Sequence, residues 1–96
     1  MRTISKKLRE IQEGLSYDER FSLSITLVVL GDLGMEKFYQ RDRTTVDKLV
    51  KAGIIKPVPQ YRHDDKGWYE PATAEIGSLL VCGSINKEDG YLVLPE

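Results

Sequence analysis

The sequence predicts an α+β fold, and three of its features support this class. Apolar residues recur every three or four positions in residues 1–15 and 43–53, which indicates amphipathic helices. Residues 54–71 hold two short runs of strand-forming residues around a charged segment, which indicates a β-hairpin. A threonine before residues 74–81 and a final apolar run at 91–94 predict one more helix and a closing strand.

The composition is that of one ordinary globular domain. The 96 residues are 41% hydrophobic and 30% charged, with a formal net charge of −1, and a chain of this length buries one modest core. Neither an internal repeat nor a linker-like tract interrupts it, so we expect residues 1–96 to form a single domain. The lone Cys82 excludes an internal disulfide and a CxxC pair, and its apolar setting predicts a buried thiol.

The distribution of apolar residues predicts a cytoplasmic protein. No apolar run approaches the roughly 18–20 residues of a membrane span. The first residues, MRTISKKLREIQEG, carry scattered charges where a signal peptide needs an apolar stretch. We therefore expect no contact with a membrane.

Residues 1–15 are predicted to form the first helix. Ile4, Leu8, Ile11 and Leu15 form one apolar stripe, and Gly14 ends the helix. Such a stripe packs either on its own domain or against the same helix of a second copy. We favour packing on the domain, while a dimer through this helix or the C-terminal tail stays an alternative.

Residues 16–30 are predicted to form the second helix. Ser16 and Glu19 have the spacing of a capping box, although the segment 21–30 also alternates with the period of a strand. Helix is favoured over strand, and the turn-forming residues GDLG at 31–34 end it. The expected inward stripe is Tyr17, Phe21, Ile25 and Val28, widened by Leu23, Leu27 and Leu30.

Two further helical segments follow. Residues 35–40, MEKFYQ, are predicted to form a short helix with Met35, Phe38 and Tyr39 inward. Residues 43–53 are predicted to form a longer helix closed by Gly53 in a left-handed conformation. Its inward side chains are expected to be Val46, Leu49 and Val50.

The second half is predicted to be a hairpin followed by a helix and a strand. In the hairpin, Pro57 and Pro59 confine the first strand to a sheet edge. Thr73 is expected to cap a helix with Ile76, Leu79 and Leu80 inward. The tail then forms two strands around a turn at residues 86–90, unless 78–94 is a single hairpin and this helix does not exist.

This order of elements resembles the winged helix-turn-helix family of DNA-binding proteins. The stretch RTTVDKLVKAGII, residues 43–55, resembles the family's recognition helix and the start of its first wing strand. The stretch YEPATAEIGSLL, residues 69–80, resembles the common closing segment, in which the second wing strand leads into a capped helix. The resemblance covers residues 17–82. It departs from the family in the shortness of the segment 35–40 and in the acidic wing tip.

The resemblance implies a transcriptional regulator that binds double-stranded DNA, as a possible homodimer, through residues 43–53 in the major groove. Residues 35–56 hold six basic side chains against three acidic ones, whereas residues 57–96 hold three against seven, so the middle of the chain is the part that suits an anion. The residues expected to read bases are Arg43, Thr44, Thr45 and Lys48. Those expected to contact phosphates are Lys37, Gln40, Arg41, Lys51 and Lys56, with Arg62 and Lys66 on the wing.

The sequence also bears on two other classes of function, catalysis and protein binding. Catalysis is not expected, because the single histidine, His63, lies in a charged turn beside Asp64 and Asp65, and we expect neither a metal nor another cofactor. The alternative to DNA binding is a protein-interaction module, an adaptor or inhibitor of a larger machine, since winged helices also serve protein contacts. Its expected contact residues are Trp68, Tyr69, Tyr91 and Leu92.

Overall fold

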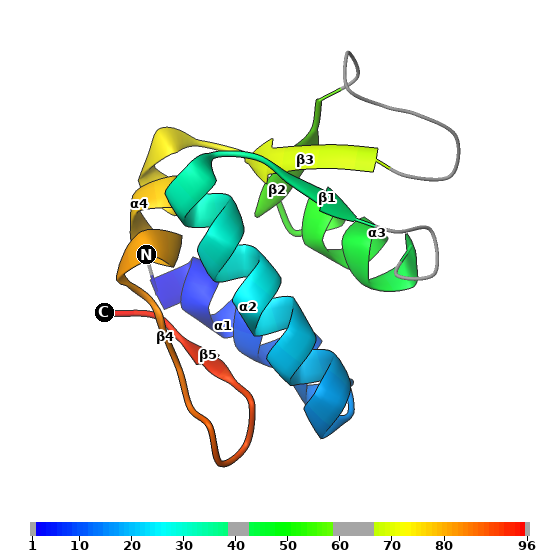
Figure 1. Ribbon diagram of the computed structural model, residues 1–96, viewed down its shortest axis with the longest axis vertical. Helices are drawn as coiled ribbons and strands as arrows, with labels where there is room; N and C mark the ends of the chain where they lie inside the picture. Colours follow the sequence, from blue (N-terminus) through cyan, green and yellow to red (C-terminus); the bar gives the residue numbers. More distant parts are fainter. Residues whose placement is uncertain (1, 39–42, 59–66, 96) are drawn as a thin grey trace.

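The computed structural model describes residues 2–38, 43–58 and 67–95 (Figure 1). Helices and short strands share one hydrophobic core, so the predicted α+β class is confirmed. In chain order the elements are α1 (Arg2–Glu13), α2 (Tyr17–Leu33), β1 (Glu36–Phe38), α3 (Arg43–Lys51), β2 (Ile55–Pro57), β3 (Gly67–Pro71), α4 (Ala74–Cys82), β4 (Ser84–Ile85) and β5 (Leu92–Val93).

The start of α2 is fixed by the predicted capping box. The Ser16 hydroxyl accepts from the Glu19 backbone N–H at 3.3 Å, and the Glu19 carboxylate accepts from the Ser16 N–H at 3.1 Å. These bonds, the one from the Ser16 backbone first, hold the pKa of Glu19 below its ordinary value. The cap therefore stabilises the fold above the ordinary pKa of a glutamate and less as the pH falls below it. Helix, not strand, is confirmed for this segment.

The buried face of α2 differs from the predicted one. Leu23, Leu27 and Leu30 lie in the core, whereas Tyr17 and Ile25 are both 42% exposed. Apolar residues of α2 occur on all sides of the helix, so the periodicity of the sequence alone does not show which of the two predicted apolar stripes is buried. The helix also continues through Gly31 to Leu33 and ends at Gly34, which has a φ of 82°.

A three-stranded antiparallel sheet with the order β1-β3-β2 lies between the helices. The pairing of β2 with β3 confirms the predicted hairpin strands. The predicted helix over residues 35–40 is wrong, because residues 36–38 form β1 and pair with β3. A segment this short gains little as an isolated helix, and pairing with β3 satisfies its backbone groups instead.

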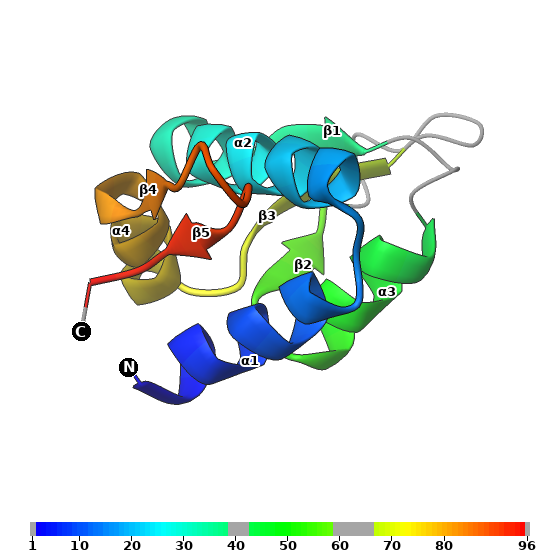
Figure 2. The same cartoon turned by 90° about the horizontal axis from the view of Figure 1, so that it is seen from below.

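The first helix packs on its own chain. Leu8 is buried, and Ile4, Ile11 and Leu15 pack against the core. α1 contacts α3 and β5, and Figure 2 shows α1 and α3 together on one side of the molecule with α2 on the other. The apolar stripe of α1 is therefore occupied within the chain, as favoured from the sequence.

The C-terminal part combines a capped helix with a small second sheet. The Thr73 hydroxyl accepts from the Ile76 N–H at 3.2 Å and begins α4, and β4 pairs with β5 in antiparallel fashion around a turn closed by Gly90. This arrangement excludes the alternative of one hairpin over residues 78–94. Cys82, at the end of α4, is exposed, so the predicted buried thiol is wrong.

A buried polar network ties α1 and α2 to the tail. The side chain of Gln12 is 1% exposed. Its Oε1 accepts from the Leu92 N–H at 2.7 Å, and its Nε2 donates to the Leu92 carbonyl at 3.3 Å, as a neighbouring strand would. The Ser24 hydroxyl lies 3.1 Å from Gln12 Oε1 and 2.9 Å from the Gly90 carbonyl oxygen. The network thus satisfies backbone groups of β5 inside the core.

Candidate nucleic-acid interface

α3 has one face in the core and one in water. Val46 and Leu49 are buried, and Gly53, with a φ of 76°, turns the chain after the helix as predicted. Val50, expected inward, is exposed because it lies at the edge of the buried face. The water-facing stripe follows the spacing i, i+3, i+4, i+7 and consists of Thr44, Asp47, Lys48 and Lys51.

Arg43 is not a free side chain at the start of this face. It is half-buried, and its Nη1 donates to the Tyr69 hydroxyl of β3 at 3.3 Å. Thr45 is also half-buried. Of the four side chains expected to read bases, only Thr44 and Lys48 are therefore exposed. Arg43 instead connects the beginning of α3 to the sheet.

The residues expected to contact phosphates divide into three groups. Lys51 is exposed in the last turn of α3, whereas Lys56 forms an ion pair with Glu70 at 3.4 Å. Lys37 belongs to β1, and its side chain lies outside the described part of the structure. The remaining residues of this set, Gln40, Arg41, Arg62 and Lys66, also lie outside the described residues.

α1 brings a further basic residue to α3. The Nζ of Lys7 donates to the Ala52 carbonyl, just beyond the end of α3, at 3.4 Å. Lys7 itself is exposed, as is the neighbouring Lys6. The sequence shows an excess of basic residues in the first helix, but periodicity does not say which later element this helix contacts. The structure places it beside α3.

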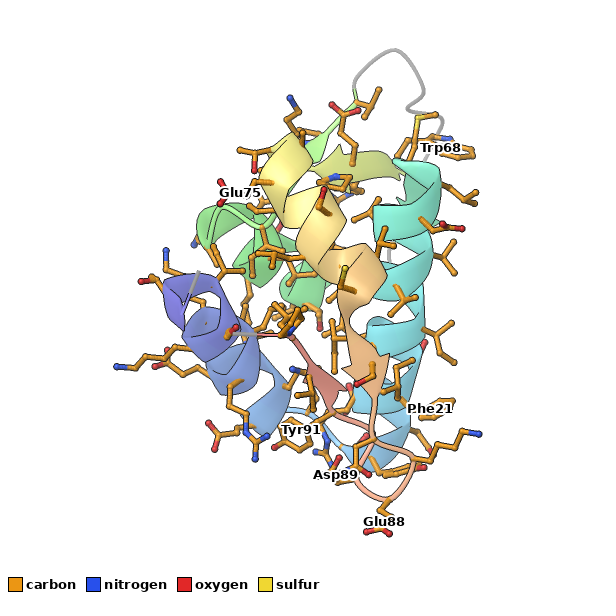
Figure 3. All side chains as sticks on the ribbon, turned by 90° about the vertical axis from the view of Figure 1, so that its left-hand side faces the viewer. Phe21, Trp68, Glu75, Glu88, Asp89 and Tyr91 are labelled. Carbon is orange, nitrogen blue, oxygen red and sulfur yellow. The ribbon has the colours of Figure 1, made fainter. Side chains whose placement is uncertain are left out.

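The residues expected to contact a protein are mostly engaged within the fold. Tyr69 is 5% exposed and Leu92 is 4% exposed, so neither side chain is available on the surface in this structure. Each alternates with more exposed residues along its strand. Trp68 is half-buried. Tyr91 is half-buried too, with the Arg9 guanidinium 4.1 Å and the Arg20 guanidinium 4.5 Å from its ring centroid (Figure 3).

An open hollow of about 400 Å³ lies between the end of α2, the start of α4 and the strands β2 and β3. Gly31, Gly34 and Gly77 are among the residues that line it. Of the polar side chains that line it, Lys56 pairs with Glu70, and Thr73 caps α4. Sequence reasoning did not anticipate this hollow.

The middle of α2 lacks charge, whereas both ends of the helix carry exposed acidic residues. From Phe21 to Gly31 the chain has no charged residue, and Ile25 within this stretch is 42% exposed. Leu33, which follows the exposed Asp32, is 70% exposed. Figure 3 shows Phe21 projecting from the side of α2 away from α1. The solvent side of α1, in contrast, carries both signs of charge. α2 therefore presents an unusually apolar surface to water.

The comparisons with protein-family models, curated proteins and solved structures found no match. Among the described residues, no helix has both the length and the apolar character needed to cross a bilayer. The same residues contain no group of three or more His, Cys, Asp or Glu side chains placed to hold a metal ion.

Proposed function

We propose that this protein binds double-stranded DNA non-covalently, as a transcriptional regulator, with α3 in the major groove. The observation that carries the proposal is the water-facing stripe of α3, which holds two lysines and a threonine at helical spacing. The major groove of DNA is wide enough to admit an α-helix, and the exposed side chains of the helix then reach base edges and phosphates.

The elements around α3 support the same function. The helix leads through Gly53 into the antiparallel strands β2 and β3, and β1 pairs with the other edge of β3. This is the strand order that a winged helix would place beside its recognition helix. The helix that packs next to α3 is α1, from the start of the chain. In our proposal α1 takes the place of the helix that the sequence predicted over residues 35–40.

In this proposal the side chains of α3 have different roles. Thr44 lies in the first turn and offers a hydroxyl and a methyl group to base edges. Lys48 lies on the same stripe one turn later, and Lys51 reaches the phosphate backbone from the last turn. Arg43 has a supporting role, because its bond to Tyr69 holds the start of the helix against β3.

The test is the anisotropy of a labelled duplex of random sequence, titrated with the protein from about 50 to 200 mM salt. Each neutralised phosphate contributes a slope of roughly −0.9 to the plot of log affinity against log salt. We expect a steep slope for the native chain and a large loss of affinity for the variant Lys48→Ala with Lys51→Ala, since both side chains are exposed. Lys87→Ala, with an exposed side chain in the tail turn, is the matched control. Equal affinities of the double variant and the control would refute the proposal.

Contact with another protein is a second candidate function, and the uncharged middle of α2, residues 21–31, favours it. This surface lies on the opposite side of the molecule from α1 and α3 (Figure 2), so the two functions use separate faces. The simplest such contact is with a second copy of the chain. Water-facing helices of monomers ordinarily carry charges, and an apolar stripe along α2 gains free energy when a partner covers it.

The prediction for this candidate concerns self-association. We expect sedimentation equilibrium to give a mass above the 10.9 kDa of one chain, and Ile25→Lys to reduce it to the monomer, because the ammonium group would stand in the middle of the covered stripe. Val93→Lys, at a residue 48% exposed on β5, should leave the native mass unchanged. A monomeric native chain at all concentrations up to about the millimolar range would exclude a dimer through α2.

A further inference from the structure

The end of α3 and the middle of α1 form one surface. The Lys7 ammonium group lies 3.4 Å from the Ala52 carbonyl. The carbonyls of the preceding turn are already used, because those of Lys48, Leu49 and Val50 accept from the N–H groups of residues 52, 54 and 53. Lys7 therefore sits at the exposed carboxyl end of α3, beside the turn that carries Lys48 and Lys51.

The ion pair that the structure shows does not involve Lys7, Lys48 or Lys51. Within the described residues that ion pair joins Lys56 to Glu70, on the sheet. Asp47 shares the α3 stripe with both lysines and lies one turn before Lys51, and Glu10 lies one turn after Lys7 on α1. The exposed lysines on these two helices, Lys6, Lys7, Lys48 and Lys51, outnumber these two acids, which leaves an excess of positive charge where α1 meets α3.

We infer that α1 completes the nucleic-acid interface, with Lys7 contacting the phosphate backbone together with Lys51. This inference rests on the proposed function of α3. A lysine ammonium group is a point charge without the fork of an arginine, so it binds phosphate without reading a base. With the carboxyl end of α3 held on the backbone by two helices, the first turn of α3, including Thr44, points to the bases.

This role differs from a purely structural one. A cation at the carboxyl end of a helix also interacts favourably with the helix dipole and so stabilises the helix. A Lys7 that only stabilised α3 would affect the unfolding midpoint and leave the salt dependence of DNA binding unchanged. A Lys7 at the interface changes that salt dependence even when the fold is intact.

The experiment compares Lys7→Ala, Lys51→Ala and Lys87→Ala in the duplex titration, after circular dichroism has shown that each variant is folded. We expect Lys7→Ala and Lys51→Ala each to reduce the magnitude of the salt slope by about 0.9, while Lys87→Ala leaves it unchanged. Lys7→Arg, which retains the charge, should restore the native slope.

The outcomes separate this inference from the proposed function. A reduced slope for Lys51→Ala with a native slope for Lys7→Ala would overturn the role of α1 and leave DNA binding by α3 in place. A native chain that does not bind the duplex even at about 50 mM salt would overturn both.

Discussion

Replacing Gln12 with alanine is expected to lower the free energy of unfolding by about 3 kcal/mol. The substitution removes both partners of the Leu92 backbone at once, since Gln12 accepts from its N–H and donates to its carbonyl. Each buried polar group that loses its partner costs about 1–3 kcal/mol, and the side chain also leaves a cavity. Urea unfolding followed by circular dichroism measures the loss.

The matched control is Glu13→Ala, which makes the same kind of truncation at the next position of α1. Glu13 is exposed, so this change should stay within about 0.5 kcal/mol of the native chain. Equal midpoints for the two alanine variants would show that the network does not hold the tail on α1 and α2.

A second substitution at the same position tests the hydrogen bond that Gln12 donates separately from the one that it accepts. Gln12→Glu retains an oxygen for the Leu92 N–H but, when ionised, cannot donate to the Leu92 carbonyl. Burial raises the pKa of such a carboxyl group in the folded state above its value of about 4.3 in the unfolded chain. The folded variant then binds more protons than the unfolded one, so its deficit in stability should shrink as the pH falls through the raised pKa.

Local signals in the sequence predicted much of the secondary structure. The caps Ser16 and Thr73 and the left-handed Gly53 are decided within a few residues of the chain, and the structure has each of them. β1 could not be predicted in this way, because residues 36–38 become a strand only through pairing with β3, some thirty residues later. The buried face of α2 was predicted wrongly for a related reason: only tertiary packing distinguishes its two apolar stripes.

The candidate site was predicted in its helix but not in its details. Spacing placed Lys48 and Lys51 on the exposed side of α3, and the structure confirms this exposure. The spacing of residues in the sequence could not show that Arg43 bonds to Tyr69 or that Lys56 pairs with Glu70. These contacts depend on how α3 and β2 lie against β3. Gln12 was missed because a polar residue beside an apolar stripe is normally exposed.

The close contact between α2 and α4 depends on Gly31. A Cβ at this position would lie 2.5 Å from the Leu80 Cβ, 2.9 Å from the Val81 nitrogen and 3.0 Å from the Gly77 carbonyl oxygen. These atoms belong to the backbone of α4 or are attached directly to it, so no side-chain rotation can relieve the overlap. The two helices must move apart, and the packing of Leu30 and Leu80 in the core is lost with them.

Gly31→Ala is therefore expected to destabilise the fold by about 1–3 kcal/mol, the usual cost of overpacking a core, although alanine favours a helix over glycine by roughly 0.8–1 kcal/mol. Gly77→Ala is the matched control on the facing helix, since a Cβ there would lie 3.4 Å from the Pro71 side chain, an ordinary contact. It should be neutral or slightly stabilising. Urea midpoints compare the two variants directly, and a Gly31→Ala protein as stable as Gly77→Ala would mean that α2 and α4 do not approach as closely as this geometry requires.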